Sequence, residues 1–318
     1  MVTSVTATSV AATSGISGVT AASTSVVTLQ QEHQAQHTPE HPAFVDLQVH
    51  TTASDGALAP AVVVQAARDA ELAAIAITDH DTVDGLDEAI EAGASLGVRI
   101  VPGVELSTHF EDEELHLLGL HIANREAIRS ALQELQAQRV VRAERIVAML
   151  NAHGMPITME AVLREAGEGA VGRPHVARAM LAGGWVKEFR EAFDKWIGFG
   201  RPAYMAKDRF DVVDAIALVH RAGGIAVWAH PGELATLARM RRLMDAGLDG
   251  VEVLHPSHPP YLAQRLFDHV RQLDLLPSGG SDWHGTADGP RKLGGQLVPH
   301  AWLAMQDARV SAKLAPVG

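Results

Sequence analysis

The sequence of 318 residues predicts an α/β barrel that is interrupted by a small helical domain. Three observations support this prediction. Short apolar segments alternate with helical segments, which is typical of parallel strands joined by crossover helices. The alternation stops between residues 123 and 201 and then resumes, as expected for an insertion into one barrel. Histidine and acidic residues follow the apolar segments, at the strand ends where barrel enzymes carry their active sites.

The first part of the barrel is predicted at residues 43–122. Four short apolar segments have the character of buried strands, at 43–50, 74–78, 99–107 and 115–122. Helices are expected at 59–71 and 83–96, and Gly97 follows the second helix as a C-cap.

The insertion, residues 123–201, is predicted to be helical and to cover the substrate. One long charged helix is expected at 124–153, and shorter helices near 158–166, 174–183 and 187–196. The barrel then continues over residues 202–318. Its strands are expected at 225–229, 250–254 and 276–279, and its helices at 211–222, 233–246 and 260–273, with one more helix possible after 294. An open doubly wound sheet is the alternative architecture.

Composition restricts the class of protein. The formal charge of −12 argues against binding of long nucleic acids, which needs clustered Lys and Arg. The absence of Cys excludes disulfides and thiolate ligands, while 17 histidines favour a search for a His/carboxylate metal site. No apolar run of about 18 residues occurs, so no membrane span is expected. Residues 1–42 are of low complexity and lack a secretory signal pattern, which predicts a disordered tail and a cytoplasmic location.

Eight residues with metal-binding side chains lie at or near the predicted strand ends. They are His50, Asp55, His80, Glu105, His116, His230, Asp282 and His284. A single histidine at such a place is more often structural, and Asp-Gly or Ser-Asp pairs are common in turns. Recurrence at successive strand ends is much harder to explain in that way, so the pattern favours a metal cluster. A sulfur-free His/carboxylate set suits Zn, Mn or Fe.

The motifs around these residues resemble those of the polymerase-and-histidinol-phosphatase (PHP) domain. In chain order they read DLQVHTTASDG, ITDHDT, PGVE, HLLG, AHP and GSDWHG. The resemblance implies a distorted seven-stranded (β/α) barrel with two or three divalent ions, most often Mn²⁺, and assigns the ligand role to the eight residues named above. Within the family, the chain looks similar to phosphatases of 3′,5′-nucleoside bisphosphates and related exoribonucleases of short RNAs.

One position departs from the family pattern. The first motif of the family is His-x-His, and here it reads Gln48-Val49-His50. Residues 48 and 50 lie on the same side of a strand, so both should face one metal. An amide oxygen is a weaker ligand for Mn or Zn than imidazole, and reduced affinity at one metal is therefore expected.

Further residues are candidates for catalysis and substrate binding. His230, Asp282 and His284 are the expected catalytic residues, and either histidine would protonate the leaving group if it is not fully committed as a ligand. Arg173 and His175 resemble a segment that related phosphatases keep facing the metals, and are assigned to the substrate phosphate. His255 and His258 are placed behind the ligands or against the substrate. Arg139, Arg142 and Arg145 share a helix face, and at least two are expected to be solvated or salt-bridged.

These observations predict hydrolysis of a phosphate monoester of a small nucleotide or short oligoribonucleotide. A metal-activated water would attack phosphorus in line. Two alternatives remain open: a phosphatase of another small metabolite, such as histidinol phosphate, and a binding domain that has lost turnover through Gln48. The oligomeric state is not predicted.

Overall fold

The computed structural model describes residues 25–35, 44–167, 171–206, 210–286 and 289–314. The described residues form one mixed eight-stranded sheet in the order β7-β6-β5-β4-β3-β2-β1-β8. The strands are β1 (Phe44–Val49), β2 (Ala74–Ile77), β3 (Arg99–Phe110), β4 (Glu113–Leu120), β5 (Ile225–Trp228), β6 (Gly250–Leu254), β7 (Leu276–Gly279) and β8 (Val298–Pro299). The predicted α/β barrel is confirmed, with β8 as one strand more than the seven expected.

The sheet curls until the chain after β7 meets β1. The amide of Asp282 donates to the carbonyl of Gln48 over 3.0 Å, and the amide of His50 donates to the carbonyl of Trp283 over 2.9 Å. Gly280 permits this approach, because a Cβ atom there would lie 2.5 Å from the Gln48 backbone nitrogen. The barrel therefore closes at the end of the strands where the candidate ligands lie.

Strand β4 corrects the expectation of a parallel sheet. It pairs antiparallel with both β3 and β5, and β8 pairs antiparallel with β1. Only Glu111 and Asp112 separate β3 from β4, and Glu111 has a φ of 60°. A link this short permits only an antiparallel hairpin. The amino-terminal half of β4 therefore lies beside the carboxyl ends of the parallel strands.

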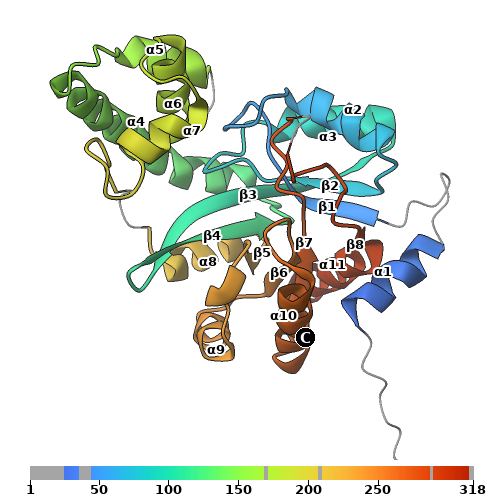
Figure 1. Cartoon of the computed structure of the whole chain (residues 1–318). Coiled ribbons are helices and arrows are strands. Elements are labelled where there is room, and N and C mark those ends of the chain that lie inside the picture. Colours follow the sequence, from blue (N-terminus) through green and yellow to red (C-terminus); the bar gives the residue numbers. More distant parts are fainter. Residues whose placement is uncertain (1–24, 36–43, 168–170, 207–209, 287–288, 315–318) are drawn as a thin grey trace, which may run out of the picture.

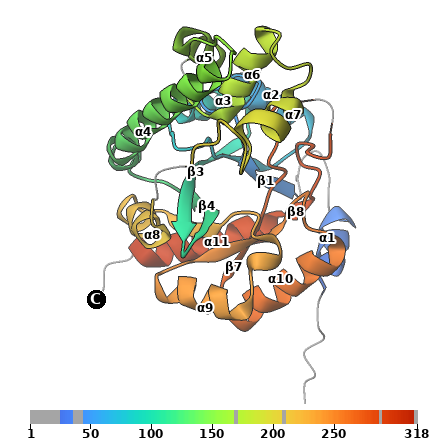
Figure 2. The ribbon, with the colours of Figure 1, turned by 60° about the vertical axis from the view of Figure 1, so that its left-hand side comes forward.

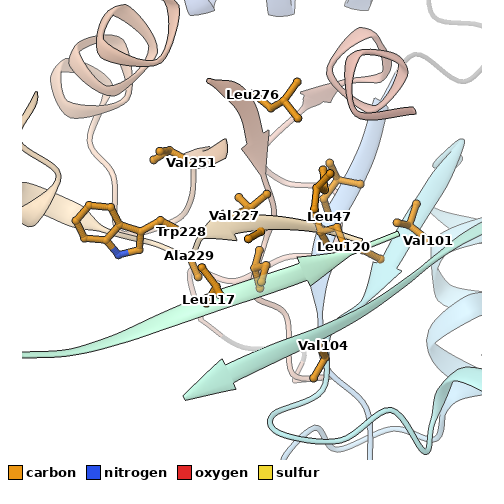
Figure 3. Close-up of a cluster of buried hydrophobic side chains, with 14 of the residues drawn as sticks. Leu47, Val101, Val104, Leu117, Leu120, Val227, Trp228, Ala229, Val251 and Leu276 are labelled. Atoms are coloured by element: carbon orange, nitrogen blue, oxygen red, sulfur yellow. The ribbon is translucent and has the colours of Figure 1, made fainter. Parts of the chain in front are cut away.

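Helices surround the sheet (Figures 1 and 2). Apolar side chains fill the barrel. The barrel helices are α2 (Pro60–Asp69), α3 (Leu86–Leu96), α8 (Val212–Arg221), α9 (Leu237–Asp245), α10 (Pro260–Gln272) and α11 (His300–Leu314), with a short 3₁₀ turn at Gly232–Leu234. As predicted, Gly97 ends α3 in the left-handed conformation, with a φ of 73°. Figure 3 shows Leu47, Leu117 and Val227 converging from different strands in the fully buried interior.

The insertion forms a lobe on one side of the barrel (Figure 1). Its helices are α4 (Arg125–Ala152), α5 (Met159–Ala166), α6 (Arg173–Ala182) and α7 (Phe189–Ala192), followed by a π-helical turn at Phe193–Ile197. They pack around their own buried side chains, among them Ile146, Leu150 and Met180, in a cluster separate from the barrel core. The inserted segment therefore has a hydrophobic core of its own.

The amino-terminal segment differs from the predicted disordered tail. Residues Val26–Ala35 form helix α1, where Val26 is buried and its amide donates to the side chain of Gln264 on α10. Gln30 donates to the carbonyl of Gln296. Residues 1–24 and 36–42 of that tail lie outside the described part of the chain. None of the helices that the structure describes is long and apolar enough to cross a membrane.

Candidate metal centre

All eight predicted ligands converge at the closed end of the barrel. His50 and Asp55 lie in the loop after β1, His80 follows β2, His230 follows β5, and Asp282 and His284 follow β7. Glu105 and His116 lie within β3 and β4. Seven of the eight contribute ligand atoms to three overlapping groups in which all atoms lie within 4.8 Å of one another: His50, Asp55, His80 and His284; His80, Glu105 and His116; and His50, Glu105 and Asp282. The eighth, His230, adjoins these groups through Glu105.

The placement of His116 corrects one step of the sequence argument. It was expected at the carboxyl end of a strand, but it lies near the beginning of β4 and pairs with Ser107 of β3. Because β4 runs antiparallel, its beginning reaches the same rim as the ends of its neighbours. His116 therefore reaches the cluster from an antiparallel strand, whereas a parallel strand was predicted.

Glu105 is the centre of the cluster. Its Oε1 lies 2.7 Å from His116 Nδ1 and 3.0 Å from His230 Nε2, and its Oε2 lies 3.1 Å from His50 Nε2. A second carboxylate, Asp282, lies 3.0 Å from the same His50 nitrogen. One buried imidazole thus lies between two buried carboxylates.

The chemistry of this donor set fits divalent ions. Burial acts to raise the pKa of Glu105, but His80 and His116 hold it well below its usual range, so the carboxylate is ionised. Burial lowers the pKa of His80 to about 3, which keeps its imidazole neutral. Metals bind ionised carboxylates and neutral imidazoles. Nδ1 of His50 and Nδ1 of His80 are also buried without a hydrogen-bond partner in the structure, as expected for atoms that await a ligand.

Gln48 lies within the cluster of candidate metal ligands. It is fully buried, and its Nε2 donates to Glu105 Oε2 over 2.9 Å, while its Oε1 is buried without a partner. The amide therefore faces Glu105 with its nitrogen. Gln48 therefore hydrogen-bonds one of the candidate metal ligands.

A cavity of about 190 Å³ opens between this cluster and the insertion. Asp55, His80 and His116 line it on the barrel side. Arg139, Arg142, Arg173 and His175 line it on the side of the insertion. The expectation that at least two of the three arginines on the long helix are solvated or salt-bridged fits the structure, because Arg139 forms an ion pair with Asp81 and Arg145 is exposed, although Arg139 and Arg142 also line the cavity.

The arginines of the insertion also hold the barrel loops. Arg139 forms an ion pair with Asp81, next to the ligand His80, and donates to Ser107 Oγ over 3.0 Å. Arg178 donates to the backbone carbonyl of Asp55 over 3.0 Å. Arg178 did not stand out in the sequence, and for Arg139 the helical spacing shows which side chains share its face but not what that face contacts.

Two of the three other candidate histidines, His175 and His258, have different surroundings. His175 lines the cavity, is buried, and accepts the Gly172 amide at Nδ1 over 3.0 Å. Burial lowers its pKa to about 4, so it is a neutral group at neutral pH. His258 binds backbone with both ring nitrogens: Nδ1 lies 3.0 Å from the Val253 carbonyl and Nε2 accepts the Gly232 amide. Of its two expected positions, these contacts favour the one behind the ligands over the one against the substrate.

The sequence patterns did not reveal three residues that support the cluster, two with carboxyl groups and one arginine. Asp79 accepts hydrogen bonds from Thr51 and Ser54, in the loop that leads to Asp55. Glu252 accepts the amide of His230 over 2.6 Å and so holds a residue whose φ of 29° is strained. Arg291 lies 2.8 Å from Asp282. The two carboxyl groups are buried beneath the rim, but no recognisable spacing in the sequence distinguishes them from other acidic residues.

Comparison with known proteins agrees with this geometry. The family model described as "PHP domain" matches residues 46–200. A 3′,5′-nucleoside bisphosphate phosphatase from Chromobacterium violaceum is 34% identical over 259 residues, which cover 79% of this chain and 91% of that protein. A 5′-3′ exoribonuclease from Salmonella typhimurium is 35% identical over 75% of this chain and 84% of its own.

Solved structures give the same result. A proposed metal-dependent phosphoesterase from Bifidobacterium adolescentis has a TM-score of 0.77 and 33% sequence identity, over 83% of this chain and 96% of that chain. The barrel, the ligand cluster and these relatives together lead to one assignment. The chain belongs to the PHP family of metal-dependent phosphoesterases.

Proposed function

We propose that the protein hydrolyses a phosphate monoester of a small nucleotide, such as a 3′,5′-nucleoside bisphosphate, or of a short oligoribonucleotide. The observation that carries this proposal is the cavity, because one wall is the ligand cluster and the opposite wall is cationic. Arg139, Arg142 and Arg173 lie across from His80 and His116. A substrate with two phosphate groups suits such a site, with one phosphate at each wall.

The proposed ligands are the eight clustered residues, which would hold two or three divalent ions, with Mn²⁺ preferred and Zn²⁺ or Fe²⁺ as alternatives. When bound, the ions activate water and neutralise charge on the phosphoryl oxygens. Arg173 would bind the phosphate that does not react, and neutral His175 would donate one hydrogen bond to it. His230 and His284 are each partly exposed at the cluster, with side-chain exposures of 26% and 20%, and either could pass a proton to the leaving oxygen.

The names of the relatives support the nucleotide substrate. One is named as a nucleoside bisphosphate phosphatase and another as an exoribonuclease, and the chain covers most of each. A charge of −12 spread over the whole protein favours a short substrate held at a local cationic site over a long nucleic acid.

Release of inorganic phosphate tests the proposal. With added Mn²⁺, we expect faster release from adenosine 3′,5′-bisphosphate than from histidinol phosphate, because only the bisphosphate reaches both walls of the cavity. A preference for histidinol phosphate would favour the metabolite phosphatase. Tight nucleotide binding without phosphate release from either compound would favour the inactive binding domain.

A further inference from the structure

An exposed aromatic side chain stands just outside the cavity. Phe199 is 87% exposed, the highest value among the exposed large hydrophobic residues of the described chain. It lies in the segment 198–206, which returns from the insertion toward the barrel. A single exposed apolar ring is common on protein surfaces, so the contacts of Phe199 decide whether it belongs to the site.

Contacts connect this ring with the cavity. Phe199 packs edge-on against Tyr204, with ring centroids 5.4 Å apart. The guanidinium of Arg173 lies over the Tyr204 ring, 5.7 Å from the ring centroid. Arg173 in turn lines the cavity beside the ligand cluster. A continuous path of cation, ring and ring therefore leads from the candidate phosphate site to the surface.

Hydrogen bonds hold the segment in one conformation. The amide of Arg201 donates to the Gly198 carbonyl over 3.1 Å, closing a turn with Phe199 at its tip. Gly200 in that turn has a φ of 70°, which glycine adopts without strain. Arg142, through Nε and Nη2, donates to the carbonyl of Met205 next to Tyr204. The exposed ring is thus presented by a fixed backbone.

Proteins bind single-stranded nucleic acid with such combinations of aromatic rings and cationic side chains. Bases stack on aromatic side chains whatever their identity, while arginines bind the backbone phosphates. Arg201 is exposed between the two rings in the sequence, and Arg173 lies at the inner end of the path. A protein partner would need apolar surface around Phe199, but the neighbouring residues Gly198, Gly200 and Arg201 offer none.

We propose that Phe199 and Tyr204 form a stacking platform for a base of a short oligoribonucleotide whose terminal phosphate lies at the ligand cluster. The inference rests on the proposed function and extends it. The platform binds a nucleotide beyond the one that reacts, so the substrate class includes short single-stranded RNA as well as mononucleotides.

The test compares two substrates in three variants. Phe199→Ala should lower kcat/KM for a 5′-phosphorylated oligoribonucleotide by about 5- to 100-fold, the range expected for loss of one base stack, chiefly through KM. Adenosine 3′,5′-bisphosphate has no second base and should be turned over as in the wild type. Phe199→Trp retains a stacking surface and should restore the oligonucleotide rate. Trp185→Ala, which removes another exposed ring of the insertion, is the matched control.

A fluorescence measurement reports stacking directly. With 2-aminopurine at the second base, the oligonucleotide should lose fluorescence on binding to the wild type and keep it on binding to Phe199→Ala. Equal losses on both substrates, or no loss on either, would overturn the platform. An altered oligomeric state with unchanged kinetics would show that the ring packs against another copy. If the wild type releases phosphate from the bisphosphate alone, the platform fails and the proposed function stands; if it acts on neither, the proposed function fails.

Discussion

Replacing Asp282 by asparagine is expected to lower the rate of phosphate release by about 100-fold or more, since loss of residues that merely support metal ligands already costs about 10- to 100-fold. Asp282 lies 3.0 Å from His50, 3.4 Å from His255 and 2.8 Å from Arg291. The carboxylate is held ionised, because burial raises its pKa less than His255 and His50 lower it. The amide has the same shape but no charge, so the loss is one of metal binding and not of packing.

The control is Asp307→Asn. Asp307 forms a two-pronged ion pair with Arg99 at the other end of β3, with contacts of 2.6 and 2.7 Å, and lies away from the cluster. This exposed pair contributes little to stability, so the variant should keep its activity. Steady-state phosphate release at saturating Mn²⁺, with circular dichroism to compare folding, makes the comparison. Near-normal turnover of Asp282→Asn with full metal content would contradict the cluster assignment.

Replacing Asp79 by alanine is expected to lower the free energy of unfolding by about 3 kcal/mol. The Asp79 carboxyl group is buried and accepts the Thr51 amide over 2.7 Å, the Thr51 hydroxyl over 2.8 Å and the Ser54 hydroxyl over 2.7 Å. Alanine leaves these donors buried and unpaired. The loop they belong to carries Asp55, so activity should fall with stability.

Urea unfolding measures the first effect, and metal-dependent phosphate release measures the second. Asp79→Asn keeps the shape of the side chain and one acceptor oxygen, so its loss of stability should be smaller than that of the alanine variant. Equal stability of the wild type and Asp79→Ala would show that the loop is held by other contacts.

The cluster could be predicted because its residues lie beside buried apolar strands. The segments around His50, His80, His230 and Asp282 each begin with a short apolar run, and the carboxyl ends of parallel strands meet at one rim. The hydrophobic pattern therefore placed these side chains together without any knowledge of their distances.

The antiparallel strand could not be predicted in the same way. The segment containing His116 is apolar enough for a buried strand, but apolar character does not reveal strand direction. Direction follows from the two-residue link after Phe110, which only a hairpin can accommodate.

The cationic wall of the cavity was also beyond the sequence pattern. Arg139 and Arg142 lie on a long charged helix, on which Arg139 is half-buried and Arg142 is buried next to apolar residues. Their burial depends on tertiary contacts with Asp81 and with the Met205 carbonyl, residues far away along the chain. Helix α1 escaped prediction for a similar reason, because its contacts with α10 lie more than 200 residues away.

Metal content measures the central claim most directly. After dialysis against Mn²⁺ and removal of excess ion, elemental analysis should find two to three equivalents of Mn²⁺ in the wild type, and at least one fewer in Asp282→Asn and in His80→Ala. Treatment with EDTA should abolish phosphate release, and added Mn²⁺ should restore it. Undiminished phosphate release by a wild-type protein that holds no divalent ion would contradict the account.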